Sequence, residues 1–176
     1  MRPELDAQLV KDHPILFGDR HGDMRTTAMC WGFECGDGWY DLLKEAADKL
    51  EPLCQKTLND WKRQEKSWYK YVRNIVNSTA KSKLLFRLMF KLVEKTIPGV
   101  YKSPLAWYGP PRASQVKEKF GTLRFYMSTS SEEMEAIISA AEKRSAITCE
   151  SCGKKGRVRG RRWLYTACSK HVRRGE

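Results

Sequence analysis

Three cysteines and one histidine near the end of the sequence have the residue types and the spacing of a metal site. Cys149 and Cys152 are separated by two residues, and Cys168 and His171 repeat that gap after an interval of fifteen residues. Zinc prefers four soft or borderline ligands in a tetrahedron, and a C-x2-C pair can wrap one ion from a single tight turn. The pattern C-x2-C-x15-C-x2-H therefore predicts that these four side chains bind one Zn²⁺ ion.

We expect this zinc to be structural. A catalytic zinc ion keeps one coordination position open for water, whereas four protein ligands close the shell. Nucleases built on such a scaffold need a histidine general base in the hairpin between the ligand pairs, and no histidine lies between Cys152 and His171.

The segment between the two ligand pairs has the composition of a two-stranded hairpin. Val158 and Arg159 precede a turn at Gly160, and Trp163 to Tyr165 supply the second arm. A short final helix would then begin at Cys168. This is the layout of a treble clef or a related zinc ribbon. The spacing also resembles that of GATA-type fingers, in which a similar gap carries Arg and Trp in a DNA-reading hairpin.

Positive charge is concentrated in two blocks of the sequence. The formal net charge is +12 and the pI is about 9.5, which favours a polyanionic partner, nucleic acid first. Residues 1–55 oppose this trend with 6 basic and 11 acidic side chains. The candidate residues for binding nucleic acid or another partner lie on two predicted helices and in the finger: Lys62, Lys66, Lys70, Arg73, Lys83, Arg87, Lys91, Lys95, Arg157, Arg159, Arg161 and Arg162.

The rows of basic residues on the two predicted helices have two explanations other than nucleic-acid binding. Basic residues four apart also describe a solvated helix face, although few acidic residues offset them here. The stretch KLLFRLMFKLVEK (83–95) could lie on a membrane surface, but its wide apolar arc favours burial in the core.

An acidic cluster, Glu34, Asp37 and Asp41, lies beside Trp39 and Tyr40. Paired carboxylates can act as acid and base or hold Mg²⁺. The preferred interpretation is a helix N-terminus, where Asp satisfies free N–H groups and meets the positive end of the dipole.

Two further patterns could bind metal. Asp19 and His21 resemble the Asp-x-His-Gly opening of metallophosphoesterases, but the later Asp, Asn and His ligands of that family are missing, which favours solvated loop charge. The remaining cysteines could form a second site with His13 and His21, although buried thiols are the favoured explanation. These cysteines are Cys30, Cys35 and Cys54.

Apolar periodicity and turn residues predict the other elements. Residues 1–36 are expected to be loops with one short strand near Met29–Phe33. Helices are predicted over residues 38–51, 53–76 and 81–95, with Asp37 as the cap of the first and Pro52 as its end or kink. Residues 114–128 predict a β-hairpin with a type II′ turn at Gly121-Thr122. A helix with a capping box from Ser130 to Glu133 follows.

These elements predict an α+β domain over residues 1–147, a small antiparallel sheet packed on helices, with basic helices at about 53–95. A zinc finger over residues 148–176 completes the chain. Trp39 and Phe125 are expected to be buried, since each lies on the apolar side of its element. The sequence has no apolar run of 18 residues and no apolar leader at its start, and its cysteines pair as metal ligands do, which favours a reducing cytoplasm.

Three blocks of the sequence resemble an uncharacterised family of small bacteriophage and prophage proteins with a C-terminal treble-clef or zinc-ribbon-like finger. The blocks are residues 30–43 (CWGFECGDGWYDLL), 115–126 (QVKEKFGTLRFY) and 142–171. Two departures concern the last block: His171 stands where relatives often have a thiol, and the Arg-rich stretch 157–162 replaces a more glycine-rich one. The resemblance implies a phage gene expressed in the host bacterial cytoplasm.

The first functional hypothesis is a non-enzymatic, zinc-binding protein that contacts nucleic acid or a nucleoprotein complex through its basic surface. The second is an inhibitor of a host protein, such as a defence complex (an anti-CRISPR or other anti-defence role) or a transcription complex, docking by the acidic N-terminal face. The third is an enzyme that uses Glu34, Asp37 or Asp41.

Overall fold

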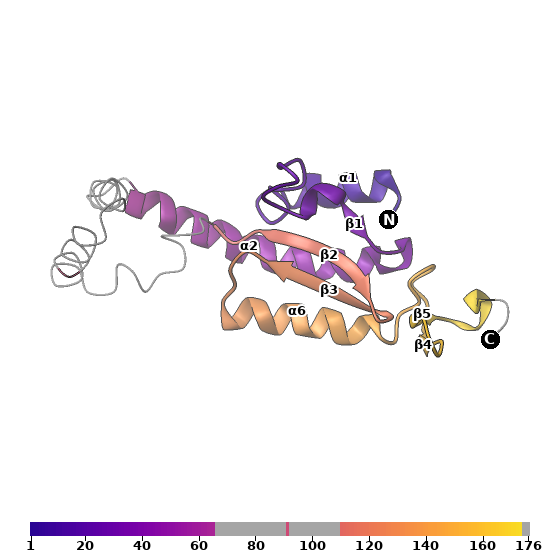
Figure 1. Ribbon diagram of the computed structural model, residues 1–176. Coiled ribbons are helices and arrows are strands. Elements are labelled where there is room, and N and C mark those ends of the chain that lie inside the picture. The colour runs from indigo at the N-terminus through magenta and orange to yellow at the C-terminus, as the bar shows by residue number, and fades with distance from the viewer. Residues whose placement is uncertain (66–90, 92–109, 174–176) are drawn as a thin grey trace. The chain divides into compact units, whose positions relative to one another are not determined.

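A computed structural model describes residues 1–65, 91 and 110–173 (Figure 1). The chain divides into two compact units, one built from Met1–Cys54 and Arg112–Glu176 and the other from Gln55–Pro111. The predicted helix over residues 81–95, apart from Lys91, and the part of the helix over 53–76 that follows Glu65 lie outside the described residues. The first unit combines helices with a small sheet, so the α+β class is confirmed.

The expectation that residues 1–36 are mainly loops is wrong for the beginning of the chain, which forms a helix. Helix α1 spans Pro3–Asp12, with proline in its first turn, where the missing N–H costs nothing, and acidic side chains near its positive end. A 3-10 turn, η1 (Met29–Trp31), and a two-residue strand, β1 (Phe33–Glu34), replace the strand expected near Met29–Phe33. Gly32 separates the two elements with a φ of +82°, a conformation that breaks a regular strand.

Helix α2 spans Tyr40–Glu65 and follows a 3-10 turn, η2 (Asp37–Trp39). Pro52 was expected to end or kink the first helix, and the first alternative is wrong, because the helix continues through it. Pro52 removes one backbone hydrogen bond, but Leu50 and Cys54 on either side of it are fully buried. The Glu51 carboxylate also accepts the backbone N–H groups of Ile15 and Leu16 at 3.0 and 2.8 Å. Tertiary contacts therefore hold the helix together across the proline.

The sheet has three strands in the order β1-β2-β3, with β2 at Ala113–Lys119 and β3 at Thr122–Met127. β2 and β3 are antiparallel as predicted, but β1 pairs with β2 in parallel, so the sheet is mixed rather than wholly antiparallel. Residue Val116 lies opposite Phe33 on one side and Phe125 on the other, and all three are buried. This register places the apolar face of the sheet on the core.

The hairpin turn lies one residue earlier than predicted. Lys119 pairs with Thr122, which leaves Phe120 and Gly121 as the two turn residues. Both have positive φ angles, +57° and +77°, so the turn is type I′ rather than type II′. Phe120 consequently lies outside the strand, and its side chain is 67% exposed.

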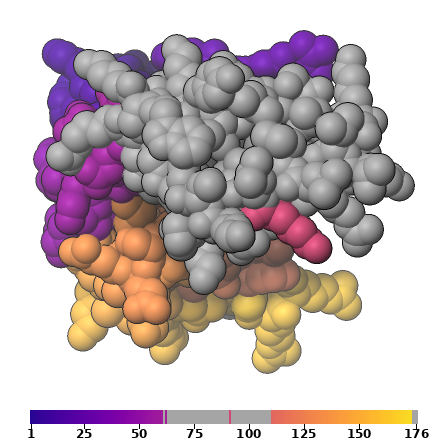
Figure 2. All heavy atoms as spheres, turned by 90° about the vertical axis from the view of Figure 1, so that its left-hand side faces the viewer, coloured from indigo at the N-terminus to yellow at the C-terminus, as the bar shows by residue number. Residues whose placement is uncertain are grey.

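Helix α6 spans Glu132–Ser145 and packs on β3 (Figure 1). Its cap is Ser131, whose hydroxyl accepts the N–H of Met134 at 3.3 Å, rather than the predicted Ser130. The Ser130 hydroxyl bonds the Glu135 carboxylate instead. Residues 130–133 at the start of the helix are exposed, and part of the orange region of the chain lies on the molecular surface in Figure 2.

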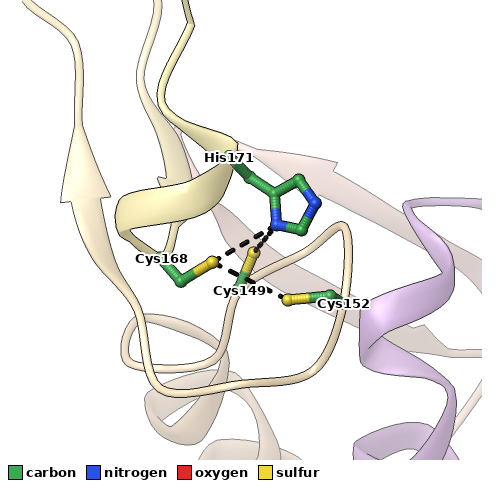
Figure 3. A group of neighbouring side chains, drawn as sticks. All are labelled: Cys149, Cys152, Cys168 and His171. Carbon is green, nitrogen blue, oxygen red and sulfur yellow. Dashed lines mark hydrogen bonds between the residues drawn. The ribbon is translucent and has the colours of Figure 1, made fainter.

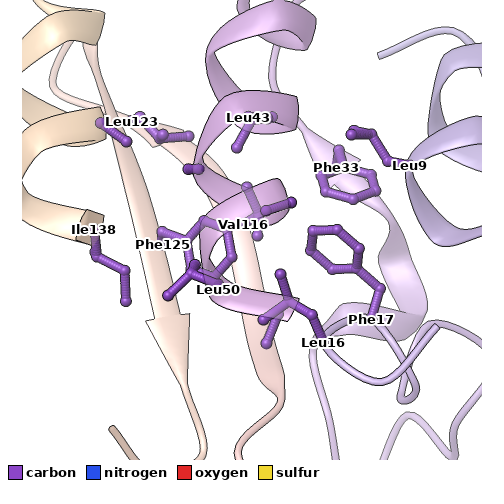
Figure 4. Close-up of a cluster of buried hydrophobic side chains, with 14 of the residues drawn as sticks. Leu9, Leu16, Phe17, Phe33, Leu43, Leu50, Val116, Leu123, Phe125 and Ile138 are labelled. Atoms are coloured by element: carbon purple, nitrogen blue, oxygen red, sulfur yellow. The ribbon is translucent and has the colours of Figure 1, made fainter. Parts of the chain in front are cut away.

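The core gathers side chains from α1, α2, the sheet and α6 (Figure 4). Phe17 lies edge-on against Phe33, with ring centroids 4.9 Å apart. Trp39 is fully buried and Phe125 is 4% exposed, so both predictions of burial are confirmed. Among the described residues, no helix is both long and apolar enough to cross a membrane.

The C-terminal segment contains a second, two-stranded sheet. Strands β4 (Arg157–Arg159) and β5 (Tyr165–Ala167) are antiparallel, and Gly160 begins their connection with a φ of +89°. The expected final helix is a single 3-10 turn, η3 (Ser169–His171), after which Val172 is extended.

Candidate metal centre

The first two candidate ligands lie on a tight turn after α6. The Gly153 N–H donates to the Cys149 carbonyl at 2.8 Å, and the Cys149 N–H donates to the Lys154 carbonyl at 2.7 Å. Gly153 has a φ of +73°, which a residue with a side chain rarely adopts. This turn, which we call the knuckle (residues 148–153), brings the thiols of Cys149 and Cys152 to the same side.

The other two candidate ligands follow strand β5. Cys168 begins the turn η3, and the His171 N–H donates to the Cys168 carbonyl at 3.2 Å. One turn of 3-10 helix therefore brings the imidazole back over the Cys168 thiol. The Glu150 N–H donates to the Thr166 carbonyl at 3.0 Å, which holds this strand against the knuckle.

All four side chains converge in space (Figure 3). Their ligand atoms lie within 4.8 Å of one another. The Cys152 and Cys168 sulfurs are 3.7 Å apart, and the His171 Nδ1 is 3.6 Å from the Cys149 sulfur and 3.2 Å from the Cys168 sulfur. Cys149 and Cys168 are buried, whereas Cys152 and His171 are exposed. The arrangement is compatible with a metal site.

Proximity also changes the acidity of these groups. Burial raises the pKa of the Cys168 thiol, but hydrogen bonds from the His171 ring and the Lys170 N–H outweigh this and lower the pKa to about 6. The hydrogen bond to Cys168 in turn raises the pKa of His171. Burial likewise raises the pKa of Cys149, and backbone N–H groups lower it by more. Cys149 and Cys168 therefore favour the thiolate, the form of cysteine that binds metal. The Lys154 N–H lowers the pKa of Cys152, but burial and the neighbouring Cys149 and Cys168 thiols raise it by more.

The knuckle packs against residues 36–39 of the first unit. The Gly38 N–H donates to the Glu150 carbonyl at 2.7 Å, and the Gly36 N–H donates to the Glu150 carboxylate at 2.9 Å. The Trp39 indole N–H donates to the Thr148 carbonyl at 2.8 Å. A Cβ on Gly38 would overlap the knuckle backbone, because it would lie only 2.5 Å from the Cys152 nitrogen. The two glycines thus let backbone approach backbone.

This docking segment was missed by the sequence analysis, which treated residues 34–41 as an acidic cluster. The available signal was the pair of glycines that flank Asp37 just before a large aromatic residue, because glycine in such a place permits close backbone approach. The contacting partner, more than 100 residues later, could not be identified from spacing alone.

The four finger arginines do not have equivalent environments. Arg157, Arg161 and Arg162 are exposed, whereas Arg159 is half-buried and its Nε donates to the Ala167 carbonyl at 3.0 Å. Arg159 thus links the two strands of the finger. Among the helix candidates, Lys62 and Lys91 are exposed. The remaining candidates lie outside the described residues: Lys66, Lys70, Arg73, Lys83, Arg87 and Lys95.

The acidic residues at positions 34, 37 and 41 have separate roles. Asp37 was expected to cap the helix that follows it, but the turn there has no side-chain cap. Its carboxylate instead accepts the backbone N–H of Arg2 at 2.7 Å and pairs with the Arg2 guanidinium at 2.6 Å. Arg2 is the N-cap residue of α1, so Asp37 stabilises the start of α1 rather than the start of α2. Glu34 accepts a bond from Gln115 at 3.1 Å, and Asp41 lies in the first turn of α2.

Several of the other candidate ligands are engaged within the fold. The buried His13 ring contacts the Leu9 carbonyl at 2.9 Å and the Asp48 carboxylate at 2.8 Å through its two nitrogens, and Asp19 pairs with Arg112. Burial raises the pKa of the Cys35 and Cys54 thiols to about 12. In the part of the chain that the structure describes, the Cys149–His171 group is the one cluster of three or more such ligands.

Comparison with known proteins adds no relative: no family model, curated protein or solved structure matches this chain.

Proposed function

We propose that this chain is a non-enzymatic, zinc-binding protein whose Cys3His centre is structural and holds a basic surface that binds nucleic acid. The observation that carries the proposal is the convergence of Cys149, Cys152, Cys168 and His171 on one small volume, next to a segment rich in arginine.

The spacing of the four ligand atoms suits zinc. With Zn–S distances of about 2.3 Å and Zn–N distances of about 2.0–2.1 Å, a tetrahedron has S–S edges of about 3.8 Å and S–N edges of about 3.6 Å. The Cys152–Cys168 separation of 3.7 Å and the Cys149–His171 separation of 3.6 Å are close to these values, and the Cys168–His171 separation of 3.2 Å is shorter. Three thiolates and one imidazole also form a common structural zinc ligand set.

A structural role follows from the ligand count and from the surroundings. Four protein ligands leave no open position for a substrate or a reactive water. The knuckle that carries two of them is hydrogen bonded to Gly36, Gly38 and Trp39, so the metal would fasten the finger to the core. This arrangement is that of a structural metal site, which joins two parts of the fold, rather than that of an active site.

The charge of the finger supports nucleic acid as the partner. Residues 153–173 contain eight Lys or Arg and no Asp or Glu. Several N-terminal carboxylates, which an inhibitor of a host protein would use for docking, are instead paired with cations of the chain itself. These pairs are Asp6–Arg20, Asp19–Arg112, Asp37–Arg2, Glu45–Arg144 and Asp48–Lys44. The resemblance to phage proteins adds a bacterial host cytoplasm as the proposed setting.

Metal content is the first test. Protein purified without chelators should contain one zinc per chain, and X-ray absorption should show three sulfur ligands and one nitrogen ligand. Cys152→Ser should lower the zinc content and loosen the finger, whereas Ser151→Ala, an exposed change in the same turn, should not. Protein that contains no metal would contradict the zinc proposal.

Salt dependence of binding is the second test. Each phosphate contact on duplex DNA contributes a slope of about −0.9 to the logarithm of affinity against the logarithm of salt, and on single strands about −0.7. Replacing Arg157, Arg161 and Arg162 with Gln should therefore flatten the slope by about two to three units. Lys11→Gln, which removes an exposed charge on α1 outside the finger, is the matched control. No binding to DNA or RNA at low salt would contradict this part of the proposal.

A further inference from the structure

Two aromatic rings project from the surface beside the basic residues of the finger. Trp163 is 71% exposed and Phe120 is 67% exposed, although each belongs to a residue type that folding normally buries. Trp163 lies in the connection between β4 and β5, and Phe120 lies in the turn between β2 and β3.

The two segments that carry these rings are in contact. A Cβ on Gly121 would lie 3.0 Å from the Tyr165 nitrogen and 3.3 Å from the Leu164 carbonyl carbon. The Thr166 hydroxyl also donates to the Gly121 carbonyl. Phe120 precedes Gly121 in one of the contacting segments. Trp163 lies one residue before Leu164 in the other segment.

Phe120 occupies a position that local energetics disfavour for its residue type. A type I′ turn requires a positive φ at both central residues and is dominated by Asn, Asp and Gly. A bulky side chain with a φ of +57° is therefore uncommon, and burial does not offset its cost here. Backbone strain of this kind is concentrated at binding sites, where the side chain is needed outside the fold.

Positive charge surrounds both rings. Arg161 and Arg162 immediately precede Trp163, and both are exposed. The Lys119 ammonium lies 5.4 Å from the centroid of the Phe120 ring. Exposed aromatic rings interleaved with cations are the composition of a surface that binds single strands, in which bases stack on the rings and phosphates meet the cations.

We propose that this surface, made of Lys119, Phe120, Arg161, Arg162 and Trp163, binds single-stranded nucleic acid by stacking bases on Phe120 and Trp163. The inference rests on the proposed function and adds the class of ligand to it. In a duplex the faces of the bases are hidden in the stack, so exposed rings would gain little there. A single strand offers every base face to an aromatic side chain.

The experiment compares a labelled oligothymidylate, an oligouridylate of equal length and a DNA duplex, by fluorescence anisotropy at low salt. Trp163→Ala should weaken single-strand binding by roughly 5- to 150-fold and leave duplex binding almost unchanged. Phe120→Gly removes the second ring without straining the turn, because glycine accepts a positive φ, and should act in the same direction. Trp31→Ala, which truncates a tryptophan that is 63% exposed on η1, is the matched control.

The outcomes distinguish failure of the single-strand inference from failure of the proposed nucleic-acid binding. Metal content and melting temperature are measured for every variant, so that a folding defect is recognised. Duplex binding as tight as single-strand binding, or full single-strand affinity in Trp163→Ala, would overturn the inference and leave nucleic-acid binding standing. Failure of the wild-type chain to bind any of the three probes would overturn both.

Discussion

Substituting Gly38 with alanine tests whether the knuckle is held by residues 36–39. A methyl group at this position would overlap the Cys149 carbonyl oxygen and would come within 2.5 Å of the Cys152 nitrogen. Such distances are below the 3.0 Å that real Cβ contacts respect, and both neighbours are backbone atoms that cannot rotate away. The φ of Gly38 is not positive, so the added methyl group causes no backbone strain of its own. The knuckle must therefore move.

The magnitude follows from the hydrogen bonds that this movement breaks. Two neutral bonds, to the Glu150 and Thr148 carbonyls, contribute about 1 kcal/mol each, and the bond to the Glu150 carboxylate contributes about 1.5–3 kcal/mol. Complete loss of the contact should cost about 3.5–5 kcal/mol of unfolding free energy. For a chain of this size that corresponds to a fall in melting temperature of about 7–20 °C.

The assay is thermal unfolding of zinc-loaded protein, combined with hydrogen exchange of the Trp39 indole N–H. In Gly38→Ala the indole hydrogen should exchange faster, because its acceptor on Thr148 has moved away. Ser151→Ala is the control on the exposed side of the knuckle and should change stability by less than about 0.5 kcal/mol. An unchanged melting temperature with slow indole exchange in Gly38→Ala would refute the docking of the knuckle on residues 36–39.

Three further predictions concern other parts of the fold. Ser131→Ala should cost about 1 kcal/mol of unfolding free energy, whereas Ser130→Ala should cost only a few tenths, since Ser131 is the cap of α6. Pro52→Ala should stabilise the chain by about 2 kcal/mol in denaturant unfolding, because it restores a helix hydrogen bond at an exposed position and loses only part of this through a freer unfolded chain. The Lys44 ammonium lowers the pKa of Asp48, so this carboxylate stabilises the fold above its unfolded pKa of about 3.9 and loses that effect as pH falls through the lower folded value. The difference in melting temperature between wild type and Asp48→Asn should therefore narrow from about pH 5 to pH 3; a constant difference would contradict the ion pair.

Local patterns in the sequence predicted the features that depend on near neighbours. The C-x2-C and C-x2-H pairs each fold around a single turn, so their spacing alone indicates that each pair converges. Burial of Trp39 and Phe125 likewise follows from the apolar period of one helix and one strand.

Errors of one residue arose where two local choices compete. A turn at Gly121-Thr122 would have placed Val116 opposite Met127, whereas the observed register places it opposite the buried Phe125. Packing of Val116 and Phe125 in the core therefore determines the register, and this register leaves Phe120 and Gly121 as the turn residues. The cap of α6 was misplaced for a similar reason, because two adjacent serines offer the same hydroxyl and only one has the correct geometry.

Features that join distant segments could not be predicted. The parallel pairing of Phe33 with Val116, and the bonds from Gly36 and Trp39 to the knuckle, connect residues 83 to 114 positions apart. No spacing within one segment encodes such contacts. Continuation of α2 through Pro52 belongs to the same class, since burial of its neighbours outweighs the helix propensity of a single residue.

The finger depends on two supports that lie outside its own core. Among the described residues, its separate buried cluster consists of Cys149, Tyr165, Ala167 and Cys168, and two of these are candidate ligands. So little buried apolar surface cannot offset the entropy of ordering a segment of this length. A bound metal, together with the contacts of the finger with residues 36–39 and with Gly121, would therefore supply most of its stability. If the proposed function is correct, the exposed arginines and Trp163 should keep their relative positions only while a metal is bound. Removal of the metal by a chelator should then abolish nucleic-acid binding, although the four protein ligands would leave the metal no position for contact with nucleic acid.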